Sequence, residues 1–474
     1  MDASAFRQHG HELVDWIAEY LDNPERYPVL ARVKPGEIAA ALPDRAPEDA
    51  ESFAAIMADF ERVLVPGVTH WNHPGFFAYF AITASAPGVL ADFLSAALNQ
   101  QAMLWRTSPA ATELEAVTLG WLRRLIGLPD VFEGVIYDTA SIATMHALVA
   151  AREAAVEGVR AKGLAGRADV PRIRVYCSEQ THSSIDKAVI AIGLGHESLR
   201  KIAVDDEFRM RADALAAAIG EDRAAGWLPI AVVATVGTTS TTSIDPVPAI
   251  AALAARERLW LHVDAAYGGV AAMLPSHAHV LAGAEHADSL VVNPHKWLFT
   301  PFDLSAFYCR RMDVVRAAFA LTPEYLRTSE PVEVRNLMDT GVQLGRRFRA
   351  LKLWFILRSF GARALRQHLA EHIRLAQLLA GWVDAHADFE RVAPVPFSVV
   401  CFRWKPAGQT ISGDALDRAN ERLIDEVNRS GEVFLSHTRL GGRIALRIAI
   451  GHLATTERHV RRAWELLQEH AAVL

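Results

Sequence analysis

Between residues 86 and 365, short apolar runs alternate with segments long enough to form helices. The run from Ile230 to Val236 consists almost wholly of apolar residues, which is typical of a strand buried on both faces of a parallel sheet. Further strand-like runs lie at residues 134–137, 173–177, 259–263 and 289–292. Parallel strands need helix-length connections, so this alternation predicts an α/β fold built on one mostly parallel sheet.

Chemically active side chains follow two of these runs directly. Asp264 ends the run at 259–263, and Lys296 follows the run at 289–292 after the backbone break Asn293-Pro294. Open α/β sheets bind ligands beyond the carboxyl ends of their strands. A lysine is most often a solvated surface residue, but a buried lysine amine can attack an aldehyde. A carboxylate at another strand end can keep a pyridine nitrogen protonated, so the pair favours a pyridoxal phosphate (PLP) site.

The composition excludes several classes of protein. The 474 residues include 51% hydrophobic and 22% charged side chains, and the net charge is −6. This balance is typical of a globular protein and provides no cationic field for nucleic acid or a membrane surface, so we expect neither as a partner. Cys177, Cys309 and Cys401 form no CxxC pair, which argues against disulfides or a thiolate zinc site and indicates a reducing cytoplasm. The chain shows neither a signal-peptide pattern nor an apolar run of about 18 residues.

Two flanking regions differ from the central one. Residues 1–85 contain two amphipathic helical patterns separated by proline-rich segments, and two such helices have no core of their own. Their apolar stripes must therefore be covered by the rest of the chain or by a second subunit. Residues 366–474 alternate helices with apolar strands, which predicts a small α+β domain. We therefore expect an arm at 1–85, a large domain at 86–365 and a small domain at 366–474.

Two further patterns have a chemical and a structural interpretation. The strand at 134–137 leads into a helix from Ala140 to Glu157, and a helix N-terminus attracts anions. Asp138, just before this helix, is expected to cap it. His70 and His73 lack the third ligand that a catalytic zinc requires, so we predict no metal site.

Four segments together resemble the group II PLP-dependent amino-acid decarboxylases, most closely the aromatic L-amino-acid decarboxylases. They are Asn293-Pro-His-Lys-Trp297, His262-Val-Asp264-Ala-Ala266-Tyr267, Thr181-His182-Ser-Ser184 and Leu344-Gly-Arg-Arg-Phe-Arg349. The resemblance covers nearly the whole chain. It implies a fold-type I PLP enzyme, similar to aspartate aminotransferase, with PLP bound in the large domain. It also implies a homodimer with the active site at the subunit interface and the N-terminal arm packed across it.

The resemblance assigns several residues to the cofactor. Lys296 would hold the PLP aldehyde, and Asp264 would keep the ring nitrogen protonated. His182 would stack on the ring, and the loop residue Tyr325 would return a proton to the substrate α-carbon. These four are the expected catalytic residues. The expected cofactor-binding residues are Ala140, Ser141, His182, Thr239, Asp264, Ala266, Asn293, His295 and Lys296.

The resemblance also indicates a pocket for the substrate side chain. The residues expected to line it are Trp71, Tyr79, Phe80, Thr83, Met103 and Gly345. For each of the aromatic rings of Trp71, Tyr79 and Phe80, packing in the hydrophobic core is as good an interpretation as lining the substrate pocket. Gly345 stands where histidine-preferring relatives tend to have serine, and the space that it leaves favours an aromatic substrate. Relatives commonly carry threonine where this chain has Ile82, so hydrogen bonding to the substrate is expected to differ there.

The expected activity is PLP-dependent decarboxylation of an aromatic L-amino acid, such as DOPA, tyrosine, phenylalanine or tryptophan, to its amine and carbon dioxide. Two alternatives stay open. An aromatic aldehyde synthase uses oxygen instead of protonation, and such relatives typically change the loop tyrosine or the stacking histidine, whereas this chain has Tyr325 and His182. The other alternative is a PLP-binding regulatory protein without turnover, against which the intact catalytic set argues.

Overall fold

The computed structural model describes residues 1–321, 334–408 and 411–474. Its contacts divide the chain into two units. The larger unit comprises Ile82–Ala380 and Arg391–Cys401, and the smaller unit comprises Met1–Ala81, Gly381–Glu390 and Phe402–Leu474. The three-part division expected from the sequence stays a prediction.

The larger unit is built on a seven-stranded sheet in the order β1-β7-β6-β5-β4-β2-β3. Only β7 runs antiparallel to its neighbours among the strands of this sheet in the described residues, so the expected α/β class with one mostly parallel sheet is confirmed. The strands are β1 (Glu133–Tyr137), β2 (Ile173–Ser178), β3 (Leu199–Ile202), β4 (Leu228–Thr235), β5 (Trp260–Asp264), β6 (Ser289–Val292) and β7 (Ser305–Cys309). The expected apolar runs do not include β3 or β7. In β3, two charged residues interrupt the apolar pattern.

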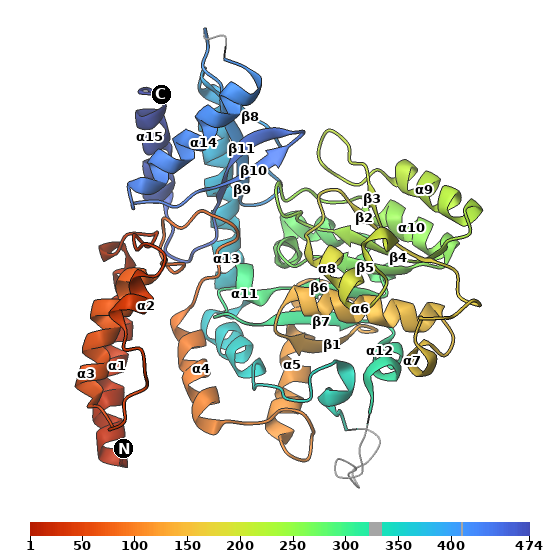
Figure 1. Ribbon diagram of the computed structural model, residues 1–474, viewed down its shortest axis with the longest axis horizontal. Helices are drawn as coiled ribbons and strands as arrows, with labels where there is room; N and C mark the ends of the chain where they lie inside the picture. Colours follow the sequence, from red (N-terminus) through yellow and green to blue (C-terminus); the bar gives the residue numbers. More distant parts are fainter. Residues whose placement is uncertain (322–333, 409–410) are drawn as a thin grey trace. The chain divides into compact units, whose positions relative to one another are not determined.

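Helices cover both faces of this sheet (Figure 1). Helix α6 contacts α8 and α12 on one face, and α9 contacts α10 on the other. Right-handed crossovers require this arrangement, because the chain moves across the sheet in one direction from β1 to β3 and returns from β3 to β5. The helices are α4 (Ala86–Leu98), α5 (Pro109–Leu125), α6 (Ala140–Ala155), α7 (Val159–Lys162), α8 (Ser184–Ala191), α9 (Ala212–Ala224), α10 (Val247–Glu257), α11 (Pro294–Trp297) and α12 (Met312–Phe319).

The smaller unit combines the N-terminal helices with strands of a second sheet, whose order is β10-β11-β9-β8. Helix α13 (Ala350–Ala385) runs from the larger unit into the smaller one and is interrupted at Gly361, whose φ of 67° suits a residue without a side chain. The other elements are α1 (Ala3–Asp22), α2 (Glu37–Ala41), α3 (Phe53–Asp59), β8 (Phe389–Arg391), β9 (Val399–Trp404), α14 (Gly413–Arg429), β10 (Ser436–Leu440), β11 (Arg443–Ala449) and α15 (Glu457–Ala471).

The N-terminal helices bury little of their apolar surface. Helix α1 contains no buried residue. It contacts α3 and the residue after it through aromatic rings, with the ring centres of Trp16 and Phe60 5.2 Å apart and His9 stacked 4.4 Å from Phe53. Phe6 nevertheless stays exposed. The expectation that this arm has no core of its own stays a prediction.

Two other expectations concern histidines and membranes. His70 shares a 3.0 Å hydrogen bond with the Tyr20 hydroxyl, and His73 accepts the Gly75 N–H at 2.8 Å, so both rings have structural partners. Within the described residues, no helix combines the length and apolar character that crossing a bilayer requires.

Candidate active site

The carboxyl ends of the parallel strands bring the predicted cofactor residues to one edge of the sheet. Asp264 is the last residue of β5, and Asn293 directly follows β6. His182 follows β2, and Thr239 follows β4. These strands are neighbours or near neighbours in the sheet, so four loops meet above the same edge. An α/β sheet binds its ligand at such an edge.

Lys296 lies on the short helix α11, and the residues before and after it are fixed by hydrogen bonds and packing. Pro294 occupies the first helical position, where a proline costs no hydrogen bond, and the Lys296 N–H donates to the Asn293 carbonyl at 2.9 Å. Next in sequence, Trp297 is buried, stacks on Tyr267 at 4.8 Å and donates from its indole nitrogen to His372 at 2.9 Å. The backbone that carries the Lys296 amine is therefore anchored by the core.

His295 has a structural role beside the lysine. The Leu304 N–H donates to its Nδ1 at 2.9 Å, and its ring lies 4.8 Å from Phe302. Burial, and to a smaller extent the charge of Lys296, lowers the pKa of His295 to about 3. Its buried ring is therefore neutral at pH 7.

Asp264 presents a carboxylate whose orientation is fixed by the backbone. The residue is buried, its carbonyl accepts the Val236 N–H at 2.9 Å, and its Oδ1 accepts the Ala266 N–H at 3.1 Å. Strands β4 and β6 flank β5 on both sides, so the main chain at Asp264 cannot shift without breaking sheet hydrogen bonds.

His182 faces the charges of both Lys296 and Asp264. Desolvation lowers the pKa of the imidazole, and Lys296 lowers it further, whereas Asp264 raises it. The Ser184 N–H donates to Nδ1 at 3.1 Å and the Ser184 hydroxyl lies 2.9 Å from the same atom, so the neutral ring carries its proton on Nε2. His182, Asp264 and Lys296 lie at the carboxyl ends of strands β2, β5 and β6 of the same sheet.

A buried histidine beneath Asp264 was not among the predicted site residues. His262 lies two positions before Asp264 on β5 and therefore on the same face of the sheet. Its Nε2 lies 3.1 Å from the Thr144 hydroxyl and its Nδ1 lies 2.9 Å from the Ser289 hydroxyl. Burial lowers the pKa of His262 to about 4. The polar residue inside an otherwise apolar run is the sequence signal that could have revealed it.

The N-terminus of α6 has the character expected of a phosphate site. Ala140 and Ser141 open the helix, and the first N–H groups of a helix have no partner within it. Asp138 does not cap the helix as expected, because the cap residue is Thr139. The Asp138 carboxylate instead accepts the Thr139 N–H at 2.6 Å and the Gln343 amide at 3.3 Å.

The remaining cofactor residues lie in loops of the larger unit. The Asn293 side chain accepts a hydrogen bond from the Ser305 hydroxyl, and Ala266 is buried. Thr239 is exposed. Its loop is held by neighbouring hydroxyl groups, with the hydroxyl oxygens of Thr238 and Thr241 3.0 Å apart.

A buried carboxylate, a lysine amine, an imidazole and a helix N-terminus at one edge fit the ring, aldehyde and phosphate of PLP.

The predicted substrate residues fall into two groups. Thr83, Met103 and Gly345 belong to the larger unit, where Thr83 is buried and a Cβ at Gly345 would lie 3.3 Å from the Gln101 amide nitrogen. Tyr325 lies outside the described residues.

Trp71, Tyr79 and Phe80 belong to the smaller unit and form a cluster of their own. Trp71 stacks against Tyr79 at 5.7 Å. The guanidinium of Arg447 donates to the Tyr79 carbonyl and lies 4.6 Å from the centre of the Phe80 ring. These contacts support the backbone of the aromatic segment.

The sequence matches the family model described as "Pyridoxal-dependent decarboxylase conserved domain" over residues 35–405. It is 40% identical to aromatic-L-amino-acid decarboxylase of Bos taurus, over 100% of this chain and 97% of that protein. It is 39% identical to phenylacetaldehyde synthase of Arabidopsis thaliana, again over 100% and 97%. The crystal structure of Oryza sativa TDC with PLP and tryptamine has a TM-score of 0.96 and 37% identity, with coverage of 100% of this chain and 99% of that one.

Proposed function

Because the chain belongs to the pyridoxal-dependent decarboxylase family, we propose an aromatic L-amino acid as its substrate and Lys296, Asp264, His182 and Tyr325 as its catalytic residues. The protein is a fold-type I, PLP-dependent amino-acid decarboxylase. The observation that carries the residue assignment is that His182, Asp264 and Lys296 stand at the carboxyl ends of strands β2, β5 and β6 of one sheet.

Each of the four residues has a proposed task, and the surroundings of Lys296, Asp264 and His182 described above suit theirs. PLP, when bound, supplies an aldehyde that captures the substrate amine. Its ring accepts the electron pair that stays behind on the α-carbon when carbon dioxide leaves. The Lys296 amine would hold that aldehyde until the substrate arrives, and the fixed Asp264 carboxylate would hold a proton on the ring nitrogen. The neutral His182 ring would cover one face of the cofactor. Tyr325 would donate its phenolic proton to the substrate α-carbon.

The preference for an aromatic substrate rests on the relatives and on the residues expected around the side chain. The relatives named above act on or produce aromatic compounds by their printed names. Gly345 lacks a side chain that would fill the space near Gln101. The Trp71, Tyr79 and Phe80 cluster offers stacking surfaces for an aromatic ring.

A panel of amino acids tests this proposal. Purified enzyme with added PLP should release carbon dioxide and an equal amount of amine from DOPA, tyrosine, phenylalanine or tryptophan. K296A should abolish both products, whereas K162A, at an exposed position of helix α7, should keep them. The proposal fails if none of these four substrates, nor glutamate or histidine, is decarboxylated.

The aldehyde synthase is a second candidate because one relative bears that name. An aldehyde synthase consumes oxygen and forms hydrogen peroxide and an aldehyde in place of the amine. The presence of Tyr325 and His182 favours the decarboxylase. Amine yields equal to carbon dioxide yields, without hydrogen peroxide, would support that choice.

We also propose a homodimer with the active site at the subunit interface, in the cytoplasm. On α4, Leu90, Phe93, Leu94 and Leu98 are exposed at helical spacing, and such an apolar stripe is typical of an interface. Cys177, Cys309 and Cys401 are buried and form no disulfide bond among the described residues, which supports a reducing compartment. Sedimentation analysis should give about twice the chain mass of 52.0 kDa, and replacing Leu94 by glutamate should shift the protein toward monomers.

A further inference from the structure

The N-terminus of α6 already holds a carboxylate of the protein itself. The Oδ1 atom of Asp138 accepts the Thr139 N–H at 2.6 Å and the Thr139 hydroxyl at 3.2 Å. Thr139 is the cap residue of α6, and its side chain makes no capping hydrogen bond to the helix. Because a helix N-terminus favours negative charge, Asp138 occupies donors that a bound anion would otherwise use.

Three further donors remain at this helix end. The N–H groups of Ala140, Ser141 and Ile142 lie in the first turn, where a helix provides no acceptor. Within the described residues, no other group accepts them either. Neighbouring backbone positions are about 3.8 Å apart, which places the Asp138 carboxylate within roughly 7 Å of the Ala140 N–H. A phosphate bound here would therefore share one helix terminus with this carboxylate.

No cation offsets the charge of Asp138 among the residues that the structure describes. The other partner of its carboxylate is the neutral amide of Gln343, at 3.3 Å, and no lysine or arginine forms an ion pair with it. The charge of Asp138 also acts on His146, but burial lowers the pKa of that imidazole to about 4. The ring is therefore neutral at pH 7, and a phosphate at this end of α6 would meet an uncompensated negative charge.

We propose that Asp138 weakens the binding of the PLP phosphate, so that the fraction of loaded enzyme follows the PLP concentration. This inference rests on the proposed PLP site. Two negative charges this close repel each other appreciably at the surface of a protein, where water screens them only in part. Pyridoxal, which lacks the phosphate, would not meet this repulsion. Asp138 therefore reduces the preference of the site for PLP over pyridoxal.

Titration of the apoenzyme with PLP and with pyridoxal, followed by visible absorbance, gives the two dissociation constants. D138N keeps the shape of the side chain and removes its charge, so the Kd for PLP should fall about tenfold at low salt. The Kd for pyridoxal should stay the same. D138S, a second neutral replacement, should give the same result, and circular dichroism confirms the fold of both variants.

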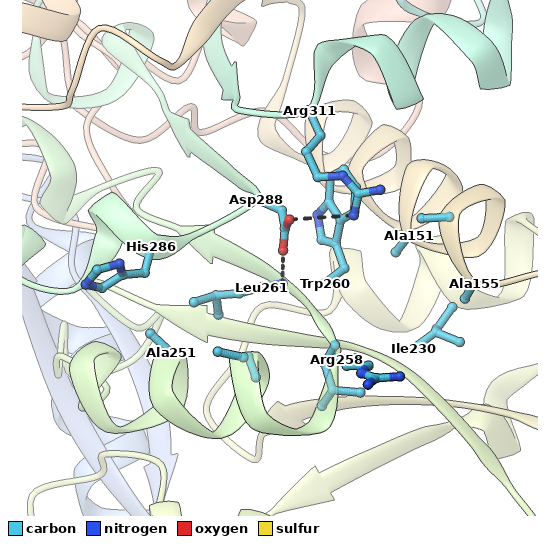
Figure 2. Close-up of a pocket in the computed structure, with 14 residues that line it drawn as sticks. Ala151, Ala155, Ile230, Ala251, Arg258, Trp260, Leu261, His286, Asp288 and Arg311 are labelled. Carbon is cyan, nitrogen blue, oxygen red and sulfur yellow. Dashed lines mark hydrogen bonds and ion pairs between the residues drawn. The ribbon is translucent and has the colours of Figure 1, made fainter.

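E157Q removes an equal charge at the other end of α6 and is the matched control. Glu157 is exposed and lies two residues beyond the helix, about 24 Å from its start at 1.5 Å per residue. Near that end, Ala151 and Ala155 line a hollow together with Trp260, the first residue of β5 (Figure 2). Asp264 lies at the opposite end of β5, so E157Q should keep both dissociation constants at their wild-type values.

The outcomes separate this inference from the proposed function. PLP could bind with a visible absorbance that K296A removes, while D138N keeps the wild-type Kd for PLP or strengthens PLP and pyridoxal equally. Either result would overturn the role of Asp138 and leave the PLP site in place. If PLP produces no such absorbance with the wild-type enzyme, the proposed function fails, and this inference fails with it.

Discussion

A buried ion pair between Glu115 and Arg346 ties the segment around Gly345 to the sheet. The two side chains are 3% and 7% exposed, and their N–O distance is 2.9 Å. Glu115 also accepts the Ile136 N–H at 2.8 Å, and Arg346 donates to the Ile136 carbonyl at 2.6 Å. Helix α5, strand β1 and the loop that carries Gly345 therefore meet at one charged contact.

Replacing Arg346 by methionine should lower the free energy of unfolding by about 3–5 kcal/mol, because the Glu115 carboxylate would stay buried without its counter-charge. The neighbouring Arg347 provides a matched control. Its side chain is 58% exposed and lies 3.6 Å from Asp92, so R347M should cost less than about 1 kcal/mol.

Urea denaturation followed by circular dichroism measures both effects. The double variant E115Q/R346M removes the carboxylate charge as well and should recover part of the loss from R346M. R346M should also lower decarboxylase activity, because the Arg346 guanidinium ties the segment that carries Gly345 to Glu115 and to the Ile136 carbonyl. If R346M and R347M destabilise the enzyme equally, the pair does not have the proposed role.

Three further perturbations give defined outcomes. The pKa of His262 is about 4 in the fold against 6.5 for the free side chain. The neutral buried ring therefore contributes about 3 kcal/mol to the free energy of unfolding above pH 6.5, and this contribution is lost as the pH falls toward 4. H262Q should flatten the plot of unfolding free energy against pH between these values, and an unchanged plot would contradict this. Trp297→Phe removes the hydrogen bond to His372 and should cost about 1–3 kcal/mol in urea unfolding, whereas an unchanged midpoint would argue against that anchor. Removing PLP should lower the thermal midpoint, because a ligand at 100 times its Kd adds about 2.7 kcal/mol, and restoring PLP should reverse the shift; identical apo and holo midpoints would contradict tight binding.

Local patterns were enough to predict the α/β class and the edge of the sheet where chemistry takes place. An apolar run followed by a polar residue specifies a buried strand and its end, and parallel strands place those ends together. Lys296 and Asp264 could therefore be proposed as site residues before their neighbours were known, and the family resemblance added His182. The helix that begins at Ala140 was also predictable, although Asp138 accepts hydrogen bonds from Thr139 and Gln343 instead of capping it; phosphate binding at its N-terminus stays a prediction.

The sequence by itself determined which residues end the strands, because strand periodicity and chain breaks depend on neighbours within a few positions. Only the tertiary structure decided which distant side chains meet. The contact of His262 with Thr144 and the pairing of Glu115 with Arg346 each join residues more than 100 positions apart. Such contacts depend on packing between elements, and short-range sequence patterns do not encode that geometry.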